Sequence, residues 1–131
     1  MFNENQNPEK FEMIKESFKK IVEALGAADL MLNPDLQLPR NQSIAELKKT
    51  EPDMTLFSDN LGKFWDAAES LTSEGSQIAL SVITAGILYE GGRTEDAVEE
   101  LTDVSNQLQQ RQEGLENIEQ MVDELISSIV S

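Results

Sequence analysis

The chain of 131 residues contains no cysteine and no histidine. The lack of cysteine excludes disulfide bonds, thiolate nucleophiles and thiolate metal sites. The lack of histidine removes the most common general base and a frequent metal ligand. We therefore predict no catalytic residues, no metal ligands, no cofactor-binding residues and no cofactor. The protein is expected to be non-enzymatic, with a reaction that uses only carboxylates, Lys, Arg or Tyr89 as the lesser alternative.

Basic residues are also scarce. Ten Lys and Arg stand against 25 Asp and Glu, which gives a net charge of −15. Such a charge repels phosphate backbones and anionic lipids, so we expect neither direct nucleic-acid binding nor membrane binding. The charge can serve solubility alone. It can also dock the protein on a basic partner, or imitate DNA and occupy a nucleic-acid-binding protein.

Long apolar runs are absent as well. Residues 77–89 form an apolar segment without charge, which is too short to span a bilayer because that requires about 20 residues. Residues 1–6 contain neither a basic region nor an apolar run, so we see no signal peptide and expect this end to be flexible. The expected location is cytoplasmic, with export by a leaderless system left open.

Residues that favour helices dominate what is present, and apolar residues make up 39% of the chain. We expect an all-α protein in which residues 1–131 form a single helical-bundle domain of four main helices plus one short helix. Proline at positions 34 and 39 predicts a loop over 27–42. The expected helices cover about 8–25, with Gly26 as a left-handed end, the short segment 44–49, then 52–71, 77–89 and 94–130.

The segment 94–130 is the main feature of the sequence and is predicted to be one long helix with a heptad pattern. At ~1.5 Å per residue it would be about 50 Å long, so part of its apolar stripe must be covered by the rest of the chain or by another molecule. One core position recurs as Leu101, Leu108, Leu115, Val122 and Ile129, and the other as Ala97, Val104, Arg111, Ile118 and Leu125.

Arg111 and Gly114 interrupt this pattern in different ways. The Arg111 stem can pack while its guanidinium reaches the surface, or the side chain can set the register across a subunit interface. Gly114 costs about 1 kcal/mol relative to Ala inside a helix, so a bend or break at this position is an open alternative. The positions that flank the stripe carry only two charges, both acidic, which favours a bundle over a simple parallel dimer.

Six residues from the end of the apolar segment into the long helix carry a local resemblance: Ala85, Leu88, Tyr89, Gly92, Ala97 and Leu101. This stretch resembles one unit of a tetratricopeptide repeat, in its small-residue contact, its turn glycine and the alanine of its second helix. No proline closes the unit and no second copy follows, so the chain is assigned to no family.

The sequence thus predicts a protein that works through protein–protein contacts, as an adaptor, chaperone-like or assembly component. The partner is another protein, or a second copy bound through the C-terminal helix. The alternative is an acidic inhibitor that mimics nucleic acid and blocks a basic protein. The candidate partner-binding residues are Leu101, Val104, Leu108, Arg111, Leu115 and Ile118.

Overall fold

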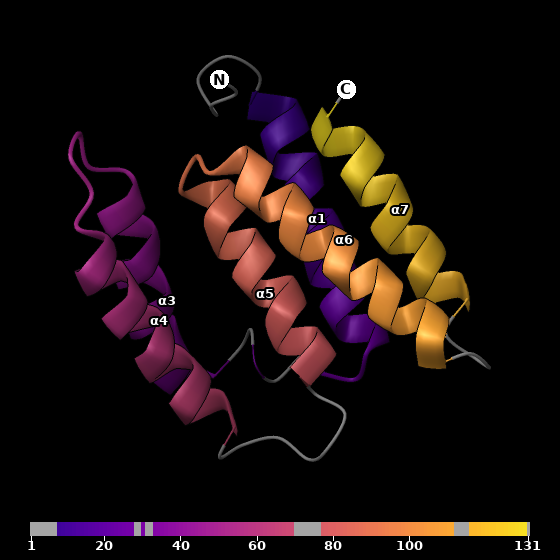
Figure 1. Cartoon of the computed structure of the whole chain (residues 1–131), viewed down its shortest axis with the longest axis horizontal. Coiled ribbons are helices and arrows are strands. Elements are labelled where there is room, and N and C mark those ends of the chain that lie inside the picture. The colour runs from indigo at the N-terminus through magenta and orange to yellow at the C-terminus, as the bar shows by residue number, and fades with distance from the viewer. Residues whose placement is uncertain (1–7, 28–29, 31–32, 70–76, 112–115, 131) are drawn as a thin grey trace.

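The computed structural model describes residues 8–27, 30, 33–69, 77–111 and 116–130, and these residues form helices without any strand (Figure 1). The all-α prediction is confirmed. The expected count of four main helices and a short one is not what the structure shows, because six helices of 14 to 18 residues are present in the described part. These are α1 (Pro8–Ala24), α3 (Pro34–Leu47), α4 (Met54–Glu69), α5 (Gln77–Glu90), α6 (Thr94–Arg111) and α7 (Glu116–Val130).

The helices form two groups that meet at α5. In the first group α5 packs against α6 and α1, while α7 packs against both α6 and α1. In the second group α3 and α4 form a hairpin that lies on the opposite side of α5 (Figure 1). The end of α7 lies beside the start of α1, so the last helix closes the first group of four.

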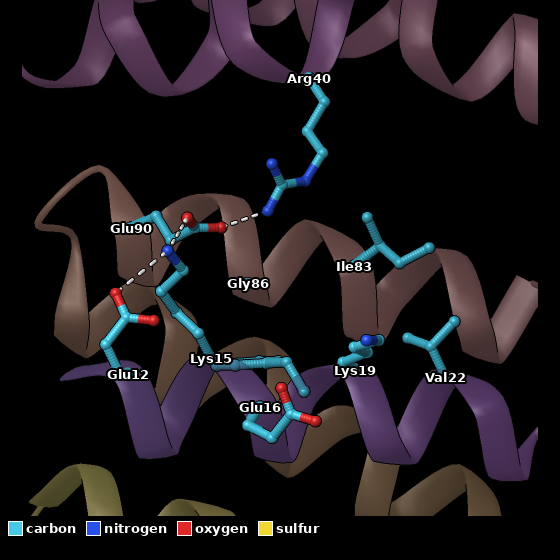
Figure 2. Close-up of a pocket in the computed structure, with 10 residues that line it drawn as sticks. Glu12, Lys15, Glu16, Lys19, Val22, Arg40, Ile83, Gly86 and Glu90 are labelled. Carbon is cyan, nitrogen blue, oxygen red and sulfur yellow. Dashed lines mark hydrogen bonds and ion pairs between the residues drawn. The ribbon is translucent and has the colours of Figure 1, made fainter. Parts of the chain in front are cut away.

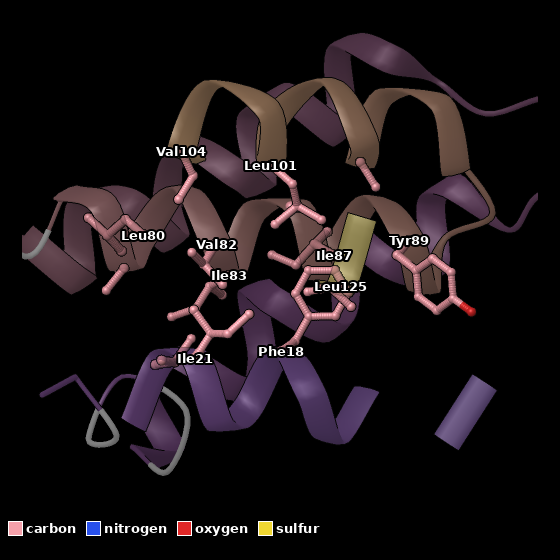
Figure 3. Close-up of a cluster of buried hydrophobic side chains, with 14 of the residues drawn as sticks. Phe18, Ile21, Leu80, Val82, Ile83, Ile87, Tyr89, Leu101, Val104 and Leu125 are labelled. Carbon is pink, nitrogen blue, oxygen red and sulfur yellow. The ribbon is translucent and has the colours of Figure 1, made fainter. Parts of the chain in front are cut away.

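The core is built around α5, which is apolar on every side. This property was expected from its uncharged sequence, because a helix without a polar face must be covered all round. Side chains from α1, α6 and α7 meet those of α5 in one buried cluster (Figure 3). Residues of this cluster include Phe18, Ile21, Leu80, Val82, Ile83, Ile87, Leu101, Val104 and Leu125.

Both α1 and α5 end at glycines that adopt the left-handed conformation, which the sequence predicted for Gly26. Gly26 has a φ of 78° and Gly92 a φ of 88°. After α1, the N–H of Ala27 donates to the carbonyl of Val22, and after α5 the N–H of Arg93 donates to that of Leu88. This pattern satisfies the last carbonyls of each helix and requires a residue that tolerates positive φ.

The predicted loop over 27–42 is wrong from Pro34 onward, because α3 begins there. Asn33 caps the helix, with its side chain accepting a hydrogen bond from the N–H of Asp35 at 2.8 Å. Pro34 occupies the first turn, where its missing N–H costs little. Pro39 lies inside the helix, which ordinarily costs about 3 kcal/mol, and the burial of the apolar face of α3 outweighs this cost. The short helix expected over 44–49 is part of α3, and Ser43, one residue before its expected start, lies inside α3 and donates to the Pro39 carbonyl at 2.8 Å.

The turn between α3 and α4 is organised by a buried carboxylate. Glu46 accepts hydrogen bonds from the Lys49 ammonium at 2.8 Å and from the N–H of Asp53 at 3.0 Å. These two bonds hold the pKa of Glu46 below its ordinary value. On the other side of the hairpin, the indole N–H of Trp65 donates to the Thr84 hydroxyl at 3.0 Å and ties α4 to α5.

The single helix predicted over 94–130 is wrong. The segment forms α6 and α7, which lie side by side and run in opposite directions (Figure 1). Folding back lets each half cover the apolar stripe of the other, which a straight rod of this length could not do on its own. The possible break at Gly114 falls on 112–115, outside the described residues.

In the described part of the chain, no helix combines the length and the hydropathy required to cross a bilayer.

We predict that Gly91→Ala destabilises the protein by about 1–3 kcal/mol, because an added methyl group overfills the contact between α3 and α5. A Cβ atom at this position would lie 2.5 Å from Cδ1 and 2.6 Å from Cβ of Leu47, which is buried. Chemical denaturation followed by circular dichroism measures the change.

Gly62→Ala is the matched control. Its Cβ would meet nothing within 4 Å, and Gly62 lies inside α4. The alanine should therefore raise the free energy of unfolding by about 0.5–1 kcal/mol through helix propensity. Equal effects of the two substitutions would contradict the close packing at Gly91.

Candidate protein-contact surfaces

The predicted partner-binding residues do not form an exposed stripe where the structure describes them. Leu101, Val104 and Leu108 of α6 are at most 1% exposed, and Ile118 of α7 is 8% exposed. They belong to the core of their own chain because the hairpin turns the stripe inward. The Arg111 side chain and Leu115 lie outside the described part. A partner can reach the four buried residues only if α6 and α7 separate.

One edge of the α6–α7 hairpin is held by hydrogen bonds between side chains. The hydroxyl of Ser105 donates to Oδ1 of Asp123 at 2.8 Å, and the amide of Gln109 donates to Oε1 of Glu119 at 2.9 Å. Ser105 is 4% exposed, so this polar contact borders the core. The bonds fix the register in which the two helices lie against each other.

The outside of the same hairpin is acidic. Residues 94–130 contain ten Asp and Glu residues, no Lys and a single Arg. We call the exposed carboxylates of α6 and α7 the acidic surface. It consists of Glu95, Glu99, Asp103, Glu116, Asp123 and Glu124.

Glu100 lies at the border between this acidic surface and α5. Partial burial raises the pKa of Glu100 above its ordinary value of 4.5, and the nearby charges of Asp103 and Glu99 raise it further. A hydrogen bond from the Ser81 hydroxyl opposes the rise. Folding therefore disfavours the ionised form of Glu100. The carboxylate is partly buried and lies near other carboxylates of α6, and both conditions lower the stability of the folded protein when Glu100 is ionised.

A groove of about 180 Å³ lies between α1, α3 and α5 (Figure 2). At one end of the groove, Glu90 of α5 forms an ion pair with Arg40 of α3 and another with Lys15 of α1, the latter at 3.6 Å. Lys15 also pairs with Glu12 at 3.6 Å and lies over the ring of Phe11. The groove is lined by Glu12, Lys15, Glu16, Phe18, Lys19, Val22, Arg40, Ile83, Gly86 and Glu90.

This groove is a weak candidate for a ligand site. Ligand pockets usually measure about 300–1,000 Å³, so its volume is small. The charges of Arg40, Lys15 and Glu90 are matched within the protein, and the apolar floor is already buried. The network joins three helices that are far apart in the sequence, and its clearest role is to hold the α3–α4 hairpin against the first group.

The exposed large apolar side chains are spread over several helices. Met13 lies on α1, Leu38 on α3, Met54 and Leu56 at the start of α4, and Val130 at the end of α7. Scattered apolar residues of this kind are common on protein surfaces and do not mark a binding site by themselves.

Tyr89 was the one uncharged residue named in the alternative prediction of a catalytic activity. It is buried next to Phe11, with ring centroids 5.4 Å apart, and near Phe18 at 6.0 Å. Burial raises the pKa of Tyr89 to about 12, so its phenol stays protonated at neutral pH.

Among the described residues, no three acidic side chains converge on a possible metal position.

No protein-family model matches this chain, and comparisons with curated proteins and with solved structures find no match either.

We predict that Glu100→Gln stabilises the protein at neutral pH. Because the pKa of Glu100 is raised in the folded state, the native protein binds more protons than the unfolded chain around that pKa. The gain from Glu100→Gln should be full above the folded pKa and should shrink as the pH falls toward 4.5 and below. Urea denaturation as a function of pH measures it.

Glu51→Gln is the control for the general relief of removing one negative charge. Glu51 is exposed and lies in the turn before α4. If both substitutions stabilise equally at every pH, the effect is not local to Glu100.

Proposed function

We propose that this protein is a non-enzymatic binding module that docks on a basic surface of another protein through the acidic surface of its α6–α7 hairpin. The observation that carries the proposal is that nearly all charges of this hairpin have the same, negative sign. Its described part contains nine carboxylates, six of them exposed, against a single arginine. An adaptor or assembly role is the function that best fits such a surface.

The charge of α1 makes the contrast clear. This helix carries four lysines and four glutamates, so its charges cancel. Lys15 forms ion pairs with Glu12 of α1 and with Glu90 of α5. Its charge is therefore used within the first group and does not neutralise the acidic surface. Charges spread evenly would serve solubility equally well, whereas a surface of one sign attracts and orients a partner of opposite sign.

The packing of the hairpin supports a surface-based mode of binding. Because the apolar stripe is buried, most of the side chains of α6 and α7 that a partner can reach are polar or acidic, with Val130 at the end of α7 as an apolar exception. Contacts on such a surface are screened over a Debye length of about 8 Å at physiological ionic strength. The affinity should therefore fall steeply with salt, unlike binding in an apolar groove.

Mimicry of nucleic acid is the second candidate, and the same surface favours it less strongly. Glu95, Glu99 and Asp103 recur every four residues along α6, which corresponds to one charge per ~6 Å of helix axis. A DNA strand carries one charge per ~3.4 Å of axis. The row on α6 has about half that linear density, so a basic protein partner need not be a nucleic-acid-binding protein.

We predict that neutralising the row on α6 abolishes partner capture. The variant Glu95→Gln, Glu99→Gln, Asp103→Asn removes three exposed charges without touching the core. Tagged protein would be incubated with a nuclease-treated native lysate, and bound proteins would be eluted with a salt gradient and identified by mass spectrometry. Basic proteins that bind the unaltered protein and elute at moderate salt should be lost with the variant.

The control variant removes three charges of the same sign from α1, as Glu9→Gln, Glu16→Gln and Glu23→Gln, all exposed. It should keep the bound proteins. If both variants capture the same set as the unaltered protein, the acidic surface is not the binding site. Added DNA that fails to compete for the captured partner argues against mimicry.

A further inference from the structure

The α3–α4 hairpin meets the rest of the chain mainly along one side of α5. Helices α3 and α4 pack against each other much more extensively than either packs against α5, and α5 is their main neighbour in the rest of the described chain. Figure 1 shows the hairpin on one side of α5, away from α6 and α7. The contacts among α1, α5, α6 and α7 therefore do not run through the hairpin.

Polar groups carry much of the contact between the hairpin and α5, which we call the seam. Arg40 of α3 forms an ion pair with Glu90 of α5, and the two side chains are only 17% and 13% exposed. Trp65 of α4 donates its indole N–H to the Thr84 hydroxyl at 3.0 Å. When the seam opens, water replaces both partners, so each bond contributes only modestly to holding it closed. Interfaces of this polar kind permit movement between the parts that they join.

The packing at the seam is also incomplete. The groove of about 180 Å³ lies where α3 meets α1 and α5 (Figure 2), and the atoms that line it have no protein neighbours on that side. By contrast, Phe18, Ile21 and Leu101 of the first group are buried where α1 and α6 pack around α5. Regions with fewer buried apolar contacts open at a lower free energy than the core does. The seam is therefore the weakest of the contacts that α5 makes.

We propose that the α3–α4 hairpin separates from α5 as one unit while α1, α5, α6 and α7 stay packed, so that it acts as a movable cover over one apolar side of α5. By helical spacing, Leu80 and Ile87 lie on the same side of α5 as Thr84 and Gly91, and both are buried in the closed form. Separation exposes these side chains. Isolated helices of 14 and 16 residues are marginal in water, so α3 and α4 lose their helical hydrogen bonds together once they leave α5.

This inference goes beyond the proposed function, since it concerns the hairpin and α5 and leaves the acidic surface of α6 and α7 exposed in both forms. Partner capture by the acidic surface and opening of the seam are measured separately, and the failure of one does not decide the other.

Hydrogen exchange of the full chain, followed by mass spectrometry of its fragments, measures the opening helix by helix. After correction for intrinsic rates, the amides of α3 and α4 should share one opening and exchange at least about tenfold faster than the most protected amides of α5 and α6. Equal protection in α3, α4, α5 and α6 would show that the chain opens only as a whole, and it would overturn the proposal.

Arg40→Met tests the seam by removing the ion pair while keeping an unbranched apolar stem. In the closed form Glu90 then stays mostly buried without Arg40, whereas in the open form water solvates it. Exchange in α3 and α4 should therefore rise about tenfold, and exchange in α6 and α7 should not change. No change in α3 and α4, or an equal rise in every helix, would contradict a separate opening.

Arg93→Met is the comparison variant, because it removes an ion pair with Asp96 that is exposed and lies outside the seam. It should leave exchange in α3 and α4 unchanged.

Thr84→Val is a second seam variant in case Arg40→Met disturbs folding, and circular dichroism checks the helix content of both. Valine keeps the shape of threonine but leaves the indole N–H of Trp65 without this acceptor in the closed form. Exchange should again rise in α3 and α4 and stay constant in α6 and α7. If neither seam variant gives this selective rise, the hairpin is not a movable cover.

Discussion

The apolar surface of α5 is the constraint on which the arrangement of the other helices depends. Its buried side chains lie on all sides of the helix, so every side must be covered. Helices α1 and α6 cover two sides, and the α3–α4 hairpin covers the remaining one. Helix α7 completes the first group by packing against α1 and α6. The electrostatic contacts lie at the borders of this apolar centre, where Glu90 joins α1, α3 and α5.

Because the apolar stripe of the C-terminal segment is buried, its residues are no longer the candidate partner-binding site, and the acidic surface takes their place as the candidate. Leu101, Val104 and Leu108 face the core, and the surface open to a partner is formed by carboxylates. A surface of this kind recognises charge and position more than shape.

Local signals in the sequence were sufficient for most helix ends and insufficient for α3. Gly26 was identified because only glycine readily adopts the required backbone conformation. Pro39 was misinterpreted because propensity argues for a break, whereas burial of Leu36, Ile44 and Leu47 holds the helix together. The charge network of Arg40, Glu90 and Lys15 had no signal in the sequence, since its members come from three separate helices.

By itself the sequence determined that the protein is helical, that its centre is the uncharged segment now seen as α5, and that its C-terminal part carries an apolar stripe on one side and carboxylates on the other. These properties follow from local periodicity and composition. Only the tertiary structure decided that 94–111 and 116–130 fold back on each other and hide the stripe. Heptad spacing states which residues must be buried, and it does not state whether the covering helix is the next one in the chain or belongs to a neighbour, because both bury the same side chains.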